Sequence, residues 1–183
     1  MNQKLAELIL FISDQLRDDR YPGFKVKLHK ILCRADFAAY RSRGQSITGE
    51  TYIKYENGPF LQAVDPTVAK LKNAGVAQWA VPDQFNAIRL ETSRSADLSS
   101  YTQEEIDWVR EAIEWARHRE TQDIVTESHQ WFGWRVTPNG EAIPYSTAVA
   151  GDVRTLSEDE NAWALSLITR YREHKRQKAE YCP

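Results

Sequence analysis

The stretch from Val26 to Phe60 limits the fold of this chain more than any other part of the sequence. Its first half has apolar residues at every third or fourth position, which predicts a helix that runs to Gly44. Half-polar residues flank this apolar stripe, so only a narrow basic strip is left to face water, namely Lys27, Lys30, Arg34 and Arg41. A helix with so little polar surface is typical of one that is contacted from several sides. We therefore expect it to be the central, buried helix of the fold.

After Gly44 the pattern changes from helical to extended. Residues 47–55 alternate in polarity and are rich in residue types that favour β-structure, which predicts an extended segment. We interpret Gly58-Pro59 as the turn that ends it. A short helix is predicted next, from Pro66 to Ala74, with Asp65 as its capping residue and Pro66 at its first position.

A β-hairpin is predicted directly after this short helix. Its strands are about Val76 to Val81 and Phe85 to Glu91, and Pro82-Asp83-Gln84 supplies the turn chemistry between them. A helix followed by a hairpin is the outline of a winged-helix unit, so a DNA-binding transcriptional regulator stays open as an alternative function. The helix carries only Lys70 and Lys72 for phosphate contacts, however, and nucleic-acid binding is not the favoured hypothesis.

The other regular elements are predicted to be helices. Two of them begin at a capping box, in which a hydroxyl residue is followed three positions later by an acidic one. The predicted helices are Gln3 to Arg17, Thr102 to about Arg119, Thr121 to Ser128, and a last helix from Ser157 with a basic end.

These elements together predict a mainly α fold with a minor β-hairpin, in which a compact helical domain surrounds the central buried helix and includes a small winged-helix-like helix-plus-hairpin element. We expect this domain to cover residues 1–150. Residues 151–183 are predicted to be a C-terminal helical extension that packs on the domain or projects from it.

Charge and cysteine content narrow the classes of partner. The 183 residues carry a formal net charge of −2, which gives no global attraction to nucleic acid or to an acidic membrane. The 2 cysteines do not make a disulfide framework, and no apolar segment approaches the length of a membrane span. These features predict a cytoplasmic protein that makes no contact with a membrane.

No group of residues predicts catalysis. His29 and Cys33 share one helical strip and could pair as imidazole and thiolate, or as two metal ligands, but no CxxC or HExxH motif accompanies them. Packing is therefore the favoured role for both. The clusters of carboxylates lie at helix ends, where acids serve as caps, and no phosphate-binding loop is present. We expect no enzymatic activity, no cofactor and no metal.

Two blocks of residues resemble the signature of a known family. The first block reads Leu28-x-Lys30-Ile31-Leu32-x-x-Ala35-Asp36-Phe37, then Ile47-Thr48-Gly49-x-x-Tyr52-x-Lys54, and then Gly58-Pro59. The second block reads Ser128-His129, then Trp134, and then Gly140-Glu141-Ala142-Ile143-Pro144-Tyr145. In this order they resemble the Panacea domain, the SocA-like antitoxin family, and the resemblance extends over about residues 5–150.

The resemblance implies an antitoxin from bacteria or their phages. Such a protein neutralises the toxin that an adjacent gene encodes, by direct non-covalent protein–protein binding. The resemblance leaves open which toxin is bound, whether the toxin is blocked or delivered to a protease, and whether the antitoxin forms homo-oligomers.

The motif positions divide into two groups. A structural role is expected for Asp36, Gly49, Gly58, Pro59, His129, Trp134, Pro144 and Tyr145. The extended segment also holds residues of the types that are common in protein interfaces, and we predict that these contact the toxin: Tyr52, Lys54, Tyr55, Asn57 and Phe60. The alternative, in which the glycines of this segment merely shape a packed loop, stays open.

Overall fold

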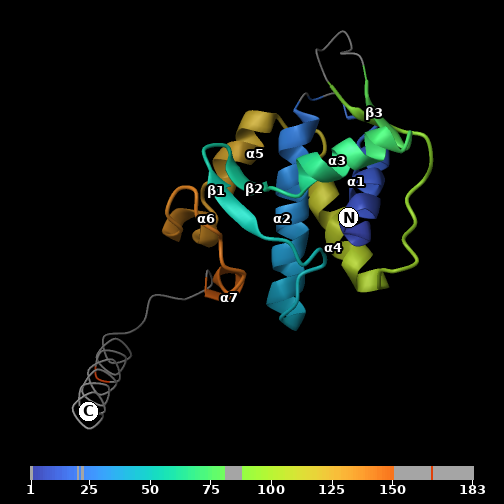
Figure 1. Cartoon of the computed structure of the whole chain (residues 1–183). Helices are drawn as coiled ribbons and strands as arrows, with labels where there is room; N and C mark the ends of the chain where they lie inside the picture. Colours follow the sequence, from blue (N-terminus) through green and yellow to red (C-terminus); the bar gives the residue numbers. More distant parts are fainter. Residues whose placement is uncertain (1, 20, 22, 81–87, 151–165, 167–183) are drawn as a thin grey trace, which may run out of the picture. The chain divides into compact units, whose positions relative to one another are not determined.

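The computed structural model describes residues 2–19, 21, 23–80, 88–150 and Ser166. Within these residues the chain forms helices α1 to α7 and two small antiparallel β-hairpins (Figure 1). The predicted mainly α fold with a minor β component is therefore confirmed.

Helix α1, Gln3–Gln15, is buried on most of its circumference. Asn2 caps it, because its side-chain oxygen accepts a hydrogen bond from the backbone N–H of Leu5 at 3.2 Å. The helix ends two residues before the predicted position. Its six most deeply buried apolar residues are each at most 1% exposed, and they are Leu5, Ala6, Leu8, Ile9, Leu10 and Ile12. The buried Glu7 is held by two hydrogen bonds from Arg94, at 2.6 and 2.8 Å.

Helix α2, Phe24–Arg43, is the centre of the fold, as predicted. It packs against α4, α5, α7 and the second strand of the first hairpin, and Figure 1 shows these elements around it. Its apolar stripe is fully buried, with Leu28, Ile31 and Ala39 each 0% exposed. Gly44 ends the helix with a φ of 74°, a left-handed conformation that glycine adopts without strain.

The predicted basic strip of α2 is wrong in its first half. Lys27 is only 1% exposed, and its Nζ lies 2.6 Å from Oδ2 of the equally buried Asp19. Lys30 is 2% exposed, and its Nζ donates a hydrogen bond to the carbonyl oxygen of Pro59 at 2.9 Å. Arg34 and Arg41 are exposed as expected. Each buried ammonium has an acceptor from a distant loop or strand, and a helical pattern cannot reveal such partners.

The first hairpin consists of β1, Tyr52–Tyr55, and β2, Gly58–Leu61. The strands are antiparallel, and Tyr52 pairs with Leu61 while Tyr55 pairs with Gly58. The reversal of the chain therefore lies at residues 56–57. The prediction that Gly58-Pro59 forms the turn is wrong, because these two residues begin the second strand.

Helix α3, Val64–Asn73, begins earlier than predicted. Its N-cap is Ala63, so the prediction that Asp65 caps the helix is wrong. Asp65 instead lies in the first turn, where its carboxylate is 2.8 Å from Nζ of Lys25. An acid in the first turn still favours the helix, because it faces the positive end of the helix dipole.

The second hairpin follows α3, as predicted. Strand β3, Ala77–Trp79, pairs antiparallel with β4, Leu90–Thr92. The predicted turn at Pro82 to Gln84 lies outside the described residues. Helix α3 packs against β3, and α1 packs against both α3 and β4. The helix-plus-hairpin element is thus present and is joined to the core through α1.

The second half of the domain consists of four helices. Helix α4, Gln103–Ala116, has the predicted capping box, since Thr102 accepts a hydrogen bond from the backbone of Glu105 and Glu105 accepts one from the backbone of Thr102. It ends before the predicted Arg119. Helix α5 covers Thr121–Ser128, as predicted, and the short helices α6, Phe132–Val136, and α7, Thr147–Ala150, lie in a region for which no helix was expected.

Residues 1–151 form one compact unit. The predicted helix from Ser157, and with it the C-terminal extension over residues 151–183, lies outside the described residues except for Ser166. Among the described residues, no helix is long and apolar enough to cross a bilayer.

Candidate functional site

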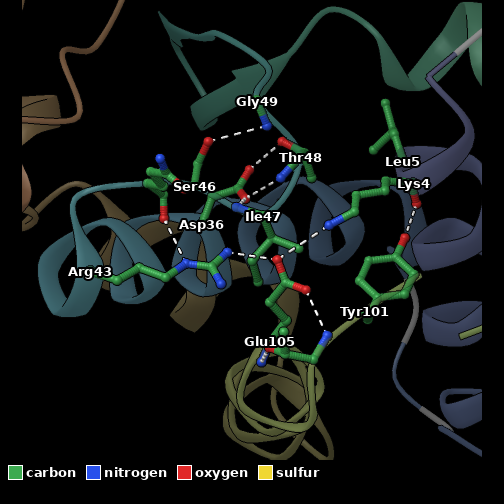
Figure 2. Close-up of polar contacts among 12 residues, drawn as sticks. Lys4, Leu5, Asp36, Arg43, Ser46, Ile47, Thr48, Gly49, Tyr101 and Glu105 are labelled. Atoms are coloured by element: carbon green, nitrogen blue, oxygen red, sulfur yellow. Dashed lines mark hydrogen bonds and ion pairs between the residues drawn. The ribbon is translucent and has the colours of Figure 1, made fainter. Parts of the chain in front are cut away.

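Asp36 on α2 is the polar centre of the region that holds the first sequence block. It is 0% exposed, and its Oδ1 accepts hydrogen bonds from the backbone N–H groups of Ile47 at 2.8 Å and Thr48 at 2.9 Å. Its Oδ2 accepts hydrogen bonds from the hydroxyl of Thr48 at 2.5 Å and from the phenol of Tyr52 at 2.7 Å. Figure 2 shows this carboxylate pointing from α2 into the loop before β1. Asp36 therefore fixes the path of the chain from the central helix into the first hairpin.

The environment of Asp36 has opposing effects on its charge. Burial raises the pKa of its carboxyl group above the usual value, although the hydrogen bonds from Thr48, Tyr52 and Ile47 act in the opposite direction. Gly49 completes the same loop with a φ of 70°, and its backbone N–H donates to the hydroxyl of Ser46 at 3.1 Å (Figure 2). The loop is thus shaped by one buried acid and one left-handed glycine.

A second buried carboxylate, Glu105 on α4, ties three helices together. It lies 2.6 Å from the guanidinium of Arg43 on α2 and 3.3 Å from the ammonium of Lys4 on α1 (Figure 2). Burial acts to raise the pKa of Glu105, but the hydrogen bonds from Arg43 and Thr102 and the charge of Lys4 bring it below the usual value. This acid is therefore held in its charged form, as a structural link beside the Asp36 loop.

Tyr52 is part of the core and not of the surface. Its side chain is 0% exposed, and its ring packs edge-on against Phe37 with ring centroids 5.9 Å apart. The prediction that Tyr52 contacts a toxin is therefore wrong for this fold. Its interface-like residue type was misleading, because the phenol serves as the partner of the buried Asp36.

Tyr145 brings the second sequence block to the same acid. Its phenol donates a hydrogen bond to the backbone carbonyl of Glu50 at 2.7 Å, and its oxygen lies 3.3 Å from Oδ2 of Asp36. Its ring stacks on Tyr40 of α2, with centroids 5.3 Å apart. The carbonyl of the preceding Pro144 accepts a hydrogen bond from Thr147 at the start of α7. Two blocks that are far apart in sequence thus meet at one buried carboxylate.

The segment before Tyr145 covers the free edge of β1. The backbone N–H of Ile143 donates to the carbonyl of Tyr52 at 2.7 Å, and the N–H of Lys54 donates to the carbonyl of Glu141 at 2.9 Å. The N–H of Gly140 donates to the carbonyl of Lys54 at 2.9 Å. Strand β1 is therefore paired on both edges, and a partner could contact it only through side chains.

Gly58 and Pro59 lie where β2 comes closest to the helices. A Cβ at Gly58 would be 2.3 Å from Oγ of Ser128 on α5 and 2.7 Å from Cε of Lys30 on α2, and its φ is 91°. Pro59 supplies the carbonyl that accepts from Lys30. Burial lowers the pKa of Lys30 to about 8. The glycine, the proline carbonyl, the lysine and the serine of the two motif blocks therefore form one close contact.

His129 and Trp134 form a stack at the tip of the first hairpin. Their rings are nearly parallel, with centroids 4.0 Å apart and an interplanar angle of 12°. The indole N–H of Trp134 donates to the carbonyl of Tyr55 at 3.2 Å, and Nζ of Lys54 lies 4.2 Å from the centre of the indole ring. These contacts attach α6 to the first hairpin, and cation–π attraction holds the lysine on the ring.

Four of the five predicted contact residues do reach the surface. Tyr55 is 45% exposed, Asn57 is exposed, and Lys54 and Phe60 are half-buried. The rings of Tyr55 and Phe60 meet edge-on at 5.3 Å. The hairpin therefore presents a small aromatic and basic surface, although Tyr52 does not belong to it.

Helix α6 adds two exposed apolar residues that sequence reasoning missed. Phe132 is 40% exposed and Val136 is 53% exposed, and they lie one helical turn apart. The helix has only five residues, so it gives no periodic signal by which these positions could have been found.

His29 and Cys33 do not form a reactive pair in this structure. Nδ1 of His29 accepts a hydrogen bond from the backbone N–H of Leu61 at 3.1 Å, and burial lowers its pKa to about 3. Cys33 is 1% exposed, and burial raises the pKa of its thiol well above the usual value. A protonated, buried thiol is a poor nucleophile. Within the described residues, no cluster of three His, Cys, Asp or Glu side chains could hold a metal ion.

Comparison with known proteins identifies a family. The family model described as "Antitoxin SocA-like, Panacea domain" matches residues 28–135, which is more than half of the chain. Neither the curated proteins nor the solved structures contain a match to the chain. The matched range runs from α2 to α6 and contains Asp36, both hairpins and the His129–Trp134 stack.

Proposed function

The chain belongs to the antitoxin SocA-like, Panacea domain family, and from this premise we propose that it is an antitoxin that neutralises a protein toxin encoded by an adjacent gene. The observation that carries the proposal is the family match over residues 28–135. Neutralisation occurs in the cytoplasm, by direct non-covalent binding in which the antitoxin blocks the toxin. Such a role is stoichiometric and needs neither a catalytic group nor a cofactor.

The surface around the first hairpin supports this proposal. Exposed aromatic and apolar side chains are the usual anchors of protein interfaces. Here Tyr55 is exposed and Phe60 is half-buried on the first hairpin, and Phe132 and Val136 are exposed on α6. Tyr55 and Phe60 stand on a hairpin whose strand β1 is paired on both edges, and a hydrogen bond from Trp134 attaches α6 to this hairpin. A rigid platform loses little conformational entropy on binding, which favours affinity.

Co-expression with the adjacent open reading frame tests the proposal. The neighbour alone should stop growth, the pair should grow, and the two proteins should co-purify as a complex. A neighbour that is harmless alone, or that stays toxic beside this protein, contradicts the proposal. A loss of toxin protein in place of a complex would show delivery to a protease and would contradict blocking. The double variant Tyr55→Ala and Phe132→Ala should weaken the complex. The control is the double variant Asp107→Ala and Arg110→Ala, which removes an exposed ion pair on α4.

A winged-helix regulator is the second candidate, and one observation favours it. The structure does contain a helix followed by an antiparallel hairpin, in the order that such a unit requires. A gel-shift assay with the DNA upstream of the gene tests this candidate at low and high salt, because non-specific phosphate contacts weaken strongly as salt rises. Retention at high salt that depends on the sequence of the DNA would favour it over the antitoxin proposal.

A further inference from the structure

A wide groove lies beside the second hairpin, away from the residues of the sequence motif. Its volume is about 740 Å³, which is within the range of ligand pockets, roughly 300–1,000 Å³. Helix α3, the N-terminal end of α2 and the second hairpin form its walls. A groove of this size accommodates several side chains of a bound partner.

The floor of the groove is apolar and aromatic. Phe24 and Trp79 meet edge-on there, with ring centroids 6.3 Å apart. Val68 and Ala69 of α3 also line the groove, as does Ile88, which has 47% of its surface exposed. A large aliphatic side chain that is half exposed in a hollow gains free energy when a partner covers it, at roughly 25 cal/mol per Å² of apolar surface.

The rim of the groove carries an excess of positive charge. Lys25 and Asp65 neutralise each other, with their charged atoms 2.8 Å apart and both side chains about half exposed. Lys72 also lines the groove and is exposed, and among the described residues it has no carboxylate within ion-pair distance. The charge that is left over at the rim is therefore a single ammonium group, which a carboxylate of a partner would match.

This combination fits a polypeptide better than a nucleic acid. A duplex needs several cations spaced along its phosphates, whereas this rim offers one unpaired lysine and an acid at Asp65. An aromatic floor with one charged position at the rim is the arrangement that receives an amphipathic segment of a protein.

We propose that this groove binds a short amphipathic segment of the toxin. An apolar side chain of this segment packs against Phe24, Trp79 and Ile88, and a carboxylate of the segment lies beside Lys72. The inference rests on the proposed antitoxin function. It adds a second contact surface that is separate from the first hairpin and contains none of the motif residues.

The test measures binding of the full chain to the product of the adjacent gene, made in a cell-free reaction, by biolayer interferometry. Ala69→Trp fills the groove from an exposed position of α3, and Lys72→Glu reverses the charge at the rim. Lys70→Glu is the matched control, because it makes the same charge change on the same helix but does not line the groove. Thermal unfolding of each variant checks that the fold is kept.

We expect Ala69→Trp to weaken binding by about tenfold or more, because the segment can no longer enter. Lys72→Glu should slow association by about tenfold at low salt, with a smaller effect at high salt, and Lys70→Glu should change affinity by less than about threefold.

The outcomes separate the two proposals. If the wild-type chain neither binds nor neutralises the neighbour, the antitoxin function itself fails. If the wild type binds and Ala69→Trp binds equally well, the groove inference is overturned while the function stands. Equal losses in Lys70→Glu and Lys72→Glu also overturn it, since they would indicate a general effect of charge. Retention of duplex DNA that depends on Lys72, with unchanged toxin binding, would assign the groove to nucleic acid and overturn the inference.

Discussion

The two hairpins of this protein are similar in size but differ in how they are held. The first hairpin is paired on both edges of β1, and the buried Lys30 and His29 of α2 hydrogen-bond to the backbone of β2. The second hairpin pairs only three residues on each strand, and its neighbourhood contains the wide groove. One hairpin is therefore built into the core, whereas the other forms the side of a hollow.

This difference separates most residues of the sequence motif, which are buried, from the residues that line the groove. The motif residues Asp36, Tyr52, Gly58 and Tyr145 are engaged with one another or with the central helix. The groove residues on α3 and the second hairpin belong to neither sequence block. The residues of the sequence motif thus serve the scaffold of this fold, and the groove is formed by residues outside the motif.

Of the substitutions at the first hairpin, loss of the buried Asp36 should lower the free energy of unfolding most. Asp36→Ala leaves the N–H groups of Ile47 and Thr48 and the phenol of Tyr52 without their acceptor. We expect the free energy of unfolding to fall by about 3–5 kcal/mol, because several buried donors lose their partner at once. Urea denaturation measures this change.

An acid on the second hairpin is the matched comparison for Asp36. Glu91 of β4 accepts a hydrogen bond from Gln78 of β3 at 3.1 Å, and both residues are exposed. Glu91→Ala should lower the free energy of unfolding by less than about 0.5 kcal/mol. If Asp36→Ala and Glu91→Ala lowered the free energy of unfolding by similar amounts, the two hairpins would not differ in how buried polar groups stabilise them.

The buried Lys30 should make the free energy of unfolding increase at alkaline pH. The pKa of Lys30 is about 8 in the folded chain, below its usual value of 10.5, so the unfolded chain binds more protons between these two values. The free energy of unfolding of the wild type, relative to Lys30→Met, should therefore rise by about 3 kcal/mol as pH increases from 8 to 10.5. Cys33 and the buried tyrosines titrate in the opposite sense, and the difference between the two proteins removes their contribution.

Lys72, at the groove beside the second hairpin, is the control for Lys30. It is exposed, so Lys72→Met makes the same chemical change without removing a buried ammonium, and its urea denaturation is measured over the same pH range. A difference between the wild type and Lys30→Met that stays constant from pH 8 to 10.5 would contradict the burial of the Lys30 ammonium beside Pro59.

The sequence predicted those elements of this fold whose signals are local. Helix α2 and its glycine end, the capping box at Thr102 and the helix at Thr121–Ser128 all follow from spacing and capping chemistry. The pairing of the second hairpin also followed from local pattern. The helix predictions depend on residues within one or two turns of each other, and the hairpin prediction depends on two short strands joined by a nearby turn.

The candidate site was less predictable, because it depends on contacts between distant residues. Tyr52 has the residue type of an interface anchor, and only its bond to Asp36 shows that it belongs to the core. Lys27 and Lys30 are buried because Asp19 and the Pro59 carbonyl meet them, and no helical pattern contains that information. The groove is likewise an arrangement of α2, α3 and the second hairpin in space.

The smallest predicted difference in the free energy of unfolding is between substitutions at two glycines, one at each hairpin. Gly58 and Gly75 have similar left-handed conformations, with φ of 91° and 69°, so an alanine at either position costs about 1–2 kcal/mol in backbone strain. A Cβ at Gly75, before β3, meets nothing within 4 Å, whereas one at Gly58 would lie 2.3 Å from Oγ of Ser128. Gly58→Ala should therefore lower the free energy of unfolding by about 2 kcal/mol more than Gly75→Ala, because the strand must move away from α2 and α5. Equal losses in urea denaturation would mean that β2 can shift without cost. The double variant Gly58→Ala and Ser128→Ala should recover part of the difference, because it removes the atom that the new Cβ meets first.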